Sequence, residues 1–406
     1  MSKHPVSGVG SARHVLRPPS VKRDAFLVFG APAIEEPEIT EVVDSLRSGW
    51  LGAGPKVAQF ERDFKAYKGA AHAVAVNSCT AALHLSMLAA GIGPGDQVIT
   101  TALTFCATVN AIIHAGATPV LVDVDPVTMN LDPEQVTARI TTKTKAILPV
   151  HFAGRPCDMD RLCALADQYH LTLIEDCAHA IEAEFRSRPT GTFGDFGCFS
   201  FYVTKNLVTG EGGMVLTRRA EDADRVKILA LHGMSQDAWA RFGDKGYKHY
   251  QVISAGFKYG MMDLQAAIGL HQLRRLDASW ARRREIWHRY HEAFAAWPLT
   301  LPAEPQPGTR HAYHLCTIRV DERRTGISRD PFLDAMTAHR IGVGVHYLSL
   351  PEHPYYQQTF GWRPTDYPQA TRIGRETVSL PLSAKLTDED VEDVIEAVRD
   401  VLERHA

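Results

Sequence analysis

The stretch AVAVNSCTAALHLSMLAAGIGPGDQVITT, residues 73–101, predicts a strand, a helix and a second strand in that order. Short β-rich runs form its two ends, and the segment from Cys79 to Ala90 between them is helical in character. The same alternation continues along the chain to Glu175. Strands that alternate with helices of about 10 to 15 residues are typical of βαβ units. The sequence therefore predicts an α/β fold with a mainly parallel sheet flanked by helices.

Four regions are expected along the chain. Helical spacing from Met261 to Phe294 indicates a connector out of a large domain, and the stretch PAEPQPGT ends it. Beyond it, strands at YHLCTIRV and GVGVHY and helices near 331–339 and 387–402 indicate a smaller α+β domain. The predicted division is a disordered tail (1–24), a large α/β domain that would hold the ligand (25–260), a connecting helix and linker (261–308) and the small α+β domain (309–406).

Composition excludes several classes of protein. The 406 residues carry a formal charge of −3 with both signs mixed along the chain, which argues against binding to nucleic acid. The basic run 282–284 falls in a helical pattern and is interpreted as a solvated helix face. No apolar run reaches the roughly 18 residues that span a bilayer, and the N-terminal stretch lacks the apolar core of a signal peptide, so a cytoplasmic protein without a membrane segment is expected.

The cysteine content also favours a protein of a reducing compartment. The seven cysteines are odd in number and scattered, which favours reduced thiols over a disulfide framework. Cys157 and Cys163 lack a partner pair at zinc spacing, so no metal site is predicted.

The pair Asp176 in LIEDCAHA and Lys205 in FYVTKN carries the chemistry. Both follow predicted strands of one sheet, where ligands of α/β proteins bind. A desolvated lysine can act as a free amine that attacks a carbonyl, and a carboxylate can keep the pyridine nitrogen of pyridoxal phosphate protonated. A structural ion pair, or two unrelated surface charges, is the alternative.

A third element is NSCTAAL, residues 77–83, where a strand runs straight into a helix. The free N–H groups at such a helix start suit a phosphate. An ordinary Ser or Thr cap explains most sequences of this kind, so the segment counts only together with Asp176 and Lys205.

A set of motifs in fixed order completes the sequence evidence. They are GWLGAGPKVAQFE, NSCTAALHLSMLAAGIGPGDQVIT, TFCATVNAIIHAGATPVLVDVD, LPVHFAGRPCDMD, IEDCAHAI, SFYVTKNLVTGEGGM, GFKYGMMDLQAAIG and SLPLSAKLTDEDV. Over residues 25–403 the chain resembles the DegT/StrS family of sugar aminotransferases, which have the fold of type I pyridoxal phosphate enzymes. Within it, the chain most resembles members that aminate the C4 ketone of a nucleotide sugar, such as the 4-amino-4-deoxy-L-arabinose enzyme.

The resemblance implies a role for individual residues. Lys205 matches the lysine that holds pyridoxal phosphate as a Schiff base, and Asp176 matches the partner of the pyridine nitrogen. The remaining cofactor-binding positions implied by the resemblance are Cys79 and Thr80 (backbone) and Ser200 for the phosphate, Phe105 stacked on the ring, and His179 beside it. From the residues alone, Phe105 and His179 would equally fit the core.

Substrate and partner contacts follow from the same resemblance. Many members carry Asn where this chain has Lys258, a position that reaches the phosphate from the neighbouring subunit of a homodimer with shared active sites. A lysine would reach it as a point charge. Trp50, His346 and Tyr347 match segments that line the sugar site, although packing roles explain them equally well.

The implied activity is transfer of an amino group, from glutamate as donor, to a keto sugar on a nucleoside diphosphate. Three alternatives are weighed against it. A sugar dehydratase of the family carries histidine at the position of Lys205, which argues against that activity. A cyclitol-ketone aminotransferase differs only in its acceptor pocket and stays open. A non-enzymatic regulatory protein on this fold would be expected to lack Asp176 or Lys205, and both are present.

Overall fold

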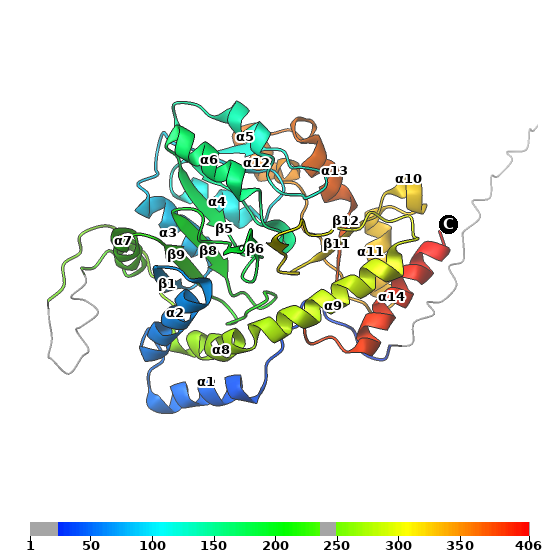
Figure 1. Cartoon of the computed structure of the whole chain (residues 1–406), viewed down its shortest axis with the longest axis horizontal. Helices are drawn as coiled ribbons and strands as arrows, with labels where there is room; N and C mark the ends of the chain where they lie inside the picture. The colour runs from blue at the N-terminus through cyan, green and yellow to red at the C-terminus, as the bar shows by residue number, and fades with distance from the viewer. Residues whose placement is uncertain (1–22, 236–248, 406) are drawn as a thin grey trace, which may run out of the picture.

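A seven-stranded sheet lies between layers of helices in the computed structural model, which describes residues 23–235 and 249–405 (Figure 1). The strand order is β1-β9-β8-β5-β4-β2-β3, and only β9 runs antiparallel to its neighbours. The strands are β1 (His72–Val76), β2 (Gln97–Thr101), β3 (Thr118–Val122), β4 (Thr144–Leu148), β5 (Thr172–Asp176), β8 (Phe196–Ser200) and β9 (Gly213–Thr217). The predicted α/β fold with a mainly parallel sheet is confirmed.

Helices cover both faces of this sheet because alternate residues of each strand point to opposite sides. In β1, Val74 and Val76 pack with α3 (Cys79–Ala89), α4 (Cys106–His114) and α7 (Ala220–Ala230). On the other face, Ala73 and Ala75 pack with α2 (Pro55–Lys68) and α8 (Asp263–Arg274). Further along that face, α5 (Pro133–Arg139) and α6 (Met159–Tyr169) cover β2, β4 and β5. Buried on both sides, the sheet can open to ligands only along its edges.

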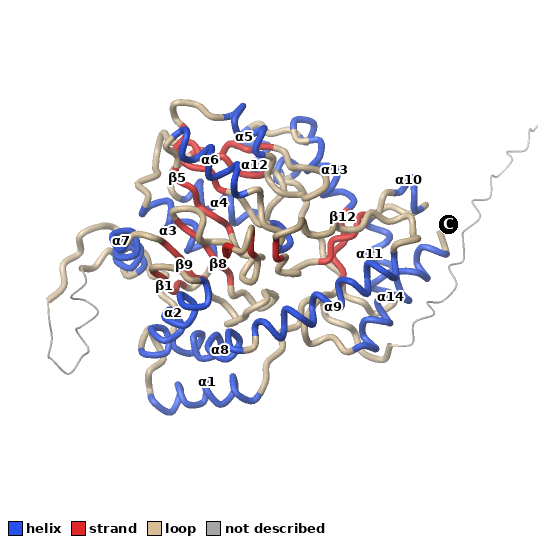
Figure 2. The backbone as a smooth tube through the Cα atoms, in the orientation of Figure 1, coloured by secondary structure: helices blue, strands red, loops and turns tan. Residues whose placement is uncertain are grey.

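A second core lies beyond the sheet, around the antiparallel pair β11 (Cys316–Arg319) and β12 (Thr377–Leu380). The long helix α9 (Leu276–Phe294) runs from the large sheet into this core, as Figures 1 and 2 show. The helices α11 (Arg329–Ala338) and α14 (Asp388–Glu403) complete it. By contrast, α12 (Pro354–Phe360) and α13 (Pro368–Glu376) pack back against the large sheet, near α4. The division of the chain into domains stays a prediction.

The remaining elements are short or peripheral. They are α1 (Glu36–Ser48), β6 (Glu184–Phe185), β7 (Arg188–Pro189), β10 (Thr309–Arg310), α10 (Glu322–Thr325) and the 3₁₀ turns Phe152–Gly154, Leu350–Glu352 and Pro364–Asp366. Strands β10, β6 and β7 form a small three-stranded sheet, which ties residues 309–310 of the C-terminal region to the large domain.

Two expected elements differ in the structure. The helical region from Met261 to Phe294 is two helices, because Arg275 leaves the helical conformation (φ −107°, ψ 10°) between α8 and α9. The expected strand at GVGVHY is wrong: the segment makes one bridge, which joins Gly344 to Ser379 of β12, and it does not pair along its length.

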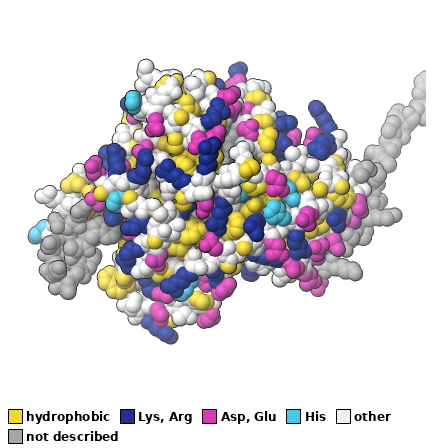
Figure 3. Space-filling model, viewed as in Figure 1, with side chains coloured by type: hydrophobic (Ala, Val, Ile, Leu, Met, Phe, Trp, Pro, Cys, Tyr) yellow, Lys and Arg dark blue, Asp and Glu magenta, His cyan; other side chains and the backbone are white. Residues whose placement is uncertain are grey.

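Three predictions concern the ends and the surface. Residues 1–22 of the expected tail lie outside the described residues, whereas Arg23 forms ion pairs with Asp390 and Asp393 of α14. On the face in Figure 3, basic and acidic side chains are intermixed. Among the described residues, no helix has the length and apolar character needed to cross a membrane.

Candidate active site

Asp176 and Lys205 meet at the edge of the sheet where β1, β2, β4, β5 and β8 end. Asp176 is the last residue of β5 and is buried, and Lys205 lies in the loop that follows β8. Burial raises the pKa of Asp176, and the Lys205 charge is one of the groups that oppose this. Burial lowers the pKa of Lys205 to about 8, against the attraction of Cys79 and Asp176. The site therefore places a buried carboxyl group beside an amine that releases its proton more readily than an ordinary lysine.

Three groups orient the Asp176 carboxylate. The Ala178 N–H donates to Oδ1 over 3.1 Å, and the Thr108 hydroxyl donates to Oδ2 over 2.9 Å. The Cys79 Sγ lies 4.0 Å from Oδ1. A carboxylate has about four lone-pair sites, so room remains for one further donor.

The start of α3 forms the opposite end of the site. The Ser78 side chain caps α3 by accepting the Ala81 N–H over 3.1 Å. Within the described residues, the N–H groups of Cys79 and Thr80 have no hydrogen-bond partner, as expected for the first turn of a helix. Two free N–H groups at a helix start suit a phosphate, in agreement with the predicted role of this backbone.

Ser200 lies beside this helix start because of one close approach. It pairs with Gly213 across β8 and β9, and a Cβ on Gly213 would come within 2.5 Å of the Ser78 carbonyl. Only glycine therefore lets β9 pass so close to α3. The Ser200 hydroxyl accepts a long hydrogen bond from the Tyr202 N–H (3.4 Å), which leaves its own proton free.

Phe105 presents an exposed ring at this edge. It is the residue before α4, and its side chain is 56% exposed in a chain whose other phenylalanines are mostly buried. Its ring centroid lies 5.8 Å from that of Tyr347. An exposed aromatic ring three residues before Thr108, which bonds Asp176, suits stacking on a flat ring held by that carboxylate.

His179 is a neutral imidazole with both nitrogens bonded. Its Nδ1 accepts the Ala153 N–H over 3.3 Å, so Nε2 carries the proton and donates to the Tyr347 hydroxyl over 3.0 Å. Burial, followed by the Lys205 charge, holds the pKa of His179 well below its usual value. The proton of the Tyr347 hydroxyl stays available to another acceptor.

His346 is held in a similar way on the other side of Tyr347. Its Nδ1 bonds Ser379 Oγ over 2.8 Å, and its ring lies 4.9 Å from the Tyr347 ring. Burial and the Lys205 charge lower the pKa of His346 to about 4. Of the three residues predicted as substrate contacts, His346 therefore lies near Lys205, and Tyr347 lies against both His346 and His179.

Sequence reasoning missed a polar network next to Lys205. Asn206 donates from Nδ2 to Glu182 (2.9 Å) and to the Ala312 carbonyl (3.0 Å), and its Oδ1 accepts from His314 Nδ1 (2.9 Å). The Glu182 carboxylate in turn pairs with Arg283 of α9, and both side chains are buried. The interpretation of the basic run 282–284 as a solvated helix face is therefore wrong for Arg283, which points inward to this carboxylate. Asn206 follows the lysine directly in FYVTKN, which was the one signal in the sequence that pointed to it.

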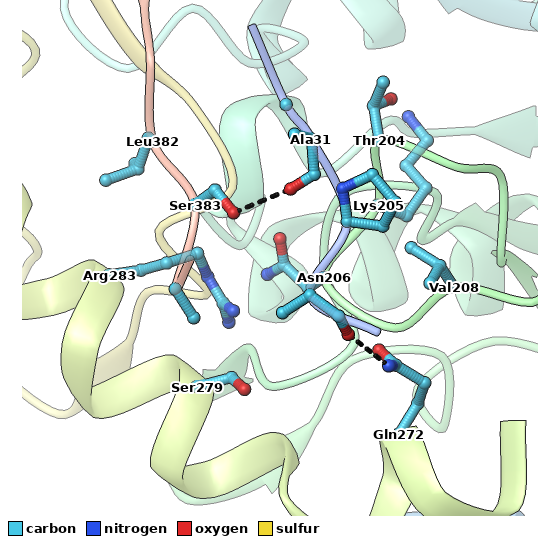
Figure 4. A pocket seen from close by; sticks show the side chains of 14 residues that line it. Ala31, Thr204, Lys205, Asn206, Val208, Gln272, Ser279, Arg283, Leu382 and Ser383 are labelled. Atoms are coloured by element: carbon cyan, nitrogen blue, oxygen red, sulfur yellow. Dashed lines mark hydrogen bonds between the residues drawn. The ribbon is translucent and has the colours of Figure 1, made fainter. Parts of the chain in front are cut away.

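Figure 4 shows the other side of this loop. Asn206 and Arg283 turn into a small cavity that Gly30, Ala31 and Ser383 also line, whereas the Lys205 side chain extends away from it. The cavity has a volume of about 30 Å³, enough for one or two waters and far too small for a cofactor. Asn206 and Arg283, which hold the loop of Lys205, therefore face this cavity, and the cofactor must bind elsewhere, on the side toward which the Lys205 side chain points.

Two predicted residues lie at the periphery. Trp50 is half-exposed between α1 and α2, beside Gly54. Lys258 is exposed, and its carbonyl accepts a long hydrogen bond from the Asn77 side chain (3.5 Å) beside the start of α3. Neither predicted role is tested by a single chain.

Among residues 23–235 and 249–405, one buried group has the composition of a metal site, namely His151, Glu175 and Cys177. Hydrogen bonds already account for it: His151 Nε2 donates to Glu175 over 3.1 Å, and His151 Nδ1 accepts the Cys157 N–H over 3.0 Å. Glu175 also accepts the N–H groups of Gly191, Phe193 and Gly194. The group is thus a satisfied core network, and the absence of a metal site stays a prediction.

Taken together, the donor set fits pyridoxal phosphate. A free amine and a carboxylate with a spare lone pair match the two ends of its pyridine ring, an exposed phenyl ring matches its face, and free N–H groups match its phosphate.

Comparison with known proteins agrees with this site. Residues 32–399 match the model of the DegT/DnrJ/EryC1/StrS aminotransferase family. The chain belongs to this family. It is 50% identical over 382 residues to the spore coat polysaccharide biosynthesis protein SpsC of Bacillus subtilis, which covers 94% of this chain and 98% of that protein.

Solved structures of sugar aminotransferases share the family fold. The putative sugar aminotransferase Spr1654 from Streptococcus pneumoniae, in its PLP form, is 34% identical with a TM-score of 0.87, over 94% of this chain and 100% of that one. PseC from Helicobacter pylori, an aminotransferase involved in the biosynthesis of pseudoaminic acid, is 26% identical with a TM-score of 0.86, over 93% and 100% of the two chains. This member of the DegT/DnrJ/EryC1/StrS family is a sugar aminotransferase that depends on pyridoxal phosphate.

Proposed function

We propose that this enzyme moves an amino group from L-glutamate to the C4 ketone of a sugar carried on a nucleoside diphosphate. The observation that carries the proposal is the meeting of the Lys205 amine and the Asp176 carboxylate at one sheet edge, under an exposed Phe105 ring. The relatives support a sugar as acceptor, since SpsC is named for spore coat polysaccharide biosynthesis and Spr1654 is titled a putative sugar aminotransferase.

The chemistry divides between the cofactor and the chain. Pyridoxal phosphate, when bound, supplies a ring that accepts electrons from the bond broken at the substrate carbon. Asp176 holds the proton on the ring nitrogen, and burial of its carboxylate makes that ion pair strong. The N–H groups of Cys79 and Thr80, with the Ser200 hydroxyl, bind the phosphate.

Lys205 has two tasks in this proposal. Its Nζ would hold pyridoxal phosphate covalently, and as a free amine it would move the proton at the substrate carbon as a general base and acid. A pKa of about 8 suits both tasks, because a fraction of the amine is unprotonated near neutral pH.

Neutral hydrogen-bonding groups support an uncharged sugar ring as acceptor. His346 and Tyr347 lie beside Lys205, and the Tyr347 hydroxyl has a proton to donate to a sugar oxygen. Neutral imidazoles and hydroxyls orient a polyhydroxylated ring without a charge to desolvate. Trp50 is proposed as an additional apolar contact of the nucleotide sugar.

A homodimer with shared sites is part of the proposal. Lys258 is exposed near the start of α3 of its own chain, and its amine would reach the phosphate site of the partner subunit. Exposed apolar side chains on α1 and near Lys258, Ile39, Leu46 and Ile253, offer surface for the contact between copies.

Two experiments test the function. First, the purified protein should be yellow with pyridoxal phosphate, lose the visible band on addition of glutamate, and carry the cofactor on Lys205 after borohydride reduction. A colourless protein, or a label on another lysine, would contradict it.

Second, the protein is converted to the amine form with glutamate and mixed with a panel of UDP-, GDP- and dTDP-linked 4-keto and 3-keto sugars, with a cyclitol ketone included. A true acceptor takes up the amino group and should restore the visible band of the pyridoxal form. A 4-keto nucleotide sugar is expected to be the best acceptor. A cyclitol ketone or a 3-keto sugar as best acceptor would refute the assignment at C4, and aspartate or glutamine as the faster donor would refute the assignment of glutamate.

A further inference from the structure

Two buried threonines form a hydroxyl chain that ends on Asp176. Thr104 Oγ1 lies 2.8 Å from Thr108 Oγ1, and Thr108 Oγ1 lies 2.9 Å from Asp176 Oδ2. Thr104 is 2% exposed and Thr108 1% exposed. Hydroxyls enclosed this way keep their partners, because water has no access to replace them.

The direction of the chain follows from the chemistry of its end. An ionised carboxylate only accepts, so the Thr108 hydroxyl donates to Asp176 Oδ2. Thr108 Oγ1 then has its lone pairs free, and the Thr104 hydroxyl donates to it. Each donor polarises the next, which strengthens the bond that reaches the carboxylate.

The same turn of chain also carries Phe105. Thr104 and Thr108 flank it at the start of α4, so the ring and the two hydroxyls belong to one turn of the chain. The helix that exposes the Phe105 ring therefore also fixes one oxygen of the Asp176 carboxylate. The Ala178 N–H holds the other oxygen, so the plane of the carboxylate is set by α4 on one side and by the chain after β5 on the other.

We propose that Thr108 is a positioning residue, oriented by Thr104, which holds Asp176 ionised and aimed at the ring nitrogen of pyridoxal phosphate. The inference rests on the proposed role of Asp176. It adds Thr108, a residue that does not touch the cofactor. Thr108 would influence the protonation of the cofactor ring through its hydrogen bond to Asp176.

Loss of the Thr108 donor should raise the pKa of Asp176, because the bond favours the charged form. Other titratable groups face the carboxylate and stay unchanged in the variants. They are Lys205 from the loop after β8, His151 from the loop after β4, Tyr347 from the C-terminal region, Cys79 from α3, Cys157, Cys177 from the chain after β5, and Cys198 from β8.

The test compares Thr108→Val, Thr108→Ser and Thr104→Val in the full-length protein. Two quantities are measured: the dissociation constant of pyridoxal phosphate from apoprotein titrated by absorbance, and the acidic limb of kcat/KM against pH. Val matches Thr in shape and lacks the hydroxyl. Thr108→Val should weaken cofactor binding about 10-fold and move the acidic limb up by about one pH unit, as expected for loss of a hydrogen bond to a charge.

The control variants distinguish the effect of losing the hydrogen bond from the effect of changing the side-chain packing. Thr108→Ser keeps the hydroxyl and should restore both the dissociation constant and the limb, although it removes a buried methyl group. Thr104→Val should give a smaller shift in the same direction, about 2-fold in binding, because Thr108 still donates. Far-UV circular dichroism and the unfolding midpoint confirm that each variant is folded.

Two outcomes would overturn the inference: a Thr108→Val protein with wild-type binding and limb, or a Thr108→Ser protein as impaired as Thr108→Val. Asp176→Asn is measured alongside. If Asp176→Asn keeps wild-type cofactor affinity and activity, the proposed function itself fails; if Asp176→Asn is inactive while Thr108→Val is normal, only the role of Thr108 fails.

Discussion

Lys205 and Lys68 are two lysines of the same domain whose pKa is lowered by burial to about 8. Lys68 is the last residue of α2 and is 2% exposed. Its Nζ donates to the Ile181 carbonyl over 2.6 Å and lies 5.2 Å from the centroid of the Phe199 ring. Lys205 lies on the open sheet edge, and among the described residues its Nζ has no hydrogen-bond partner.

The difference shows that a lowered pKa does not by itself identify a catalytic lysine. The Lys68 amine is committed to a carbonyl and an aromatic face, so a reactant has no path to it. The pKa of the Lys205 amine is lowered to a similar value, but Lys205 is only partly buried and, within the described residues, its amine has no hydrogen-bond partner. Access and an uncommitted amine, more than acidity, separate the two residues.

The largest expected effect comes from removing each lysine in turn. Lys205→Ala should lower kcat by roughly 10⁴-fold, since both covalent attachment and proton transfer are lost. Lys68→Met, the matched control, should keep kcat within about 3-fold, because Met fills the volume and takes no part in the chemistry. Steady-state assay with glutamate and a keto sugar measures both. Equal losses in the two variants would remove the distinction.

Asp176→Asn should lower kcat/KM by roughly 10² to 10³-fold, because the ring nitrogen loses its anionic partner.

The same substitution should make the apoprotein more stable at high pH. Burial raises the pKa of Asp176 above the ordinary value, so its stabilising contribution is present at low pH and is lost as the pH rises through the folded-state pKa. At pH 8, Asp176→Asn apoprotein should therefore unfold at higher denaturant concentration than wild type. A less stable variant would contradict this.

The support behind Lys205 should also prove costly to disturb. Arg283→Met leaves the buried Glu182 carboxylate without its cation, and should lower the free energy of unfolding by about 3 kcal/mol. Arg186→Met, which removes an exposed ion pair with Asp160, serves as the control and should change stability little. Urea unfolding of the apoproteins measures both. Equal destabilisation by the two changes would show that burial of the Arg283 pair is unimportant.

The smallest expected effect is the pH dependence with which the two lysine amines react with an acylating reagent. Lys205 of the apoprotein should react with an amine-acylating reagent increasingly as the pH rises through about 8, since the neutral amine is the nucleophile. Lys68 has the same pKa and should stay unlabelled in the folded protein, because it is enclosed. Peptide mass spectrometry after a short pulse reads both sites. Labelling of Lys68 at the rate of Lys205 would overturn the argument from access.

Much of the fold was predictable because the signal was local. The stretch from Ala73 to Thr101 alternates apolar runs and helical spacing, and the helix Met159–Tyr169 begins and ends where the pattern indicated. The segment GVGVHY misled because an alternating pattern in a short run does not show that a partner strand pairs with it along its length. Such a chain can bridge at Gly344 without forming a strand.

The site was predictable in its chemical types and less so in its supports. Asp176 and Lys205 carried distinctive chemistry and followed predicted strands. Thr108, His314 and Glu182 are ordinary residue types in the sequence. Their roles depend on contacts across 68 residues from Thr108 to Asp176 and 108 residues from Asn206 to His314.

The sequence by itself determined the alternation of strands and helices, and with it the sheet edge where an aspartate and a lysine must emerge, because hydrophobic periodicity is a local property. The tertiary structure decided which amine stays free, which histidine nitrogens carry protons and which hydroxyl holds Asp176. Those outcomes depend on how deeply each group is buried and which partner lies within hydrogen-bond distance, and packing alone sets both.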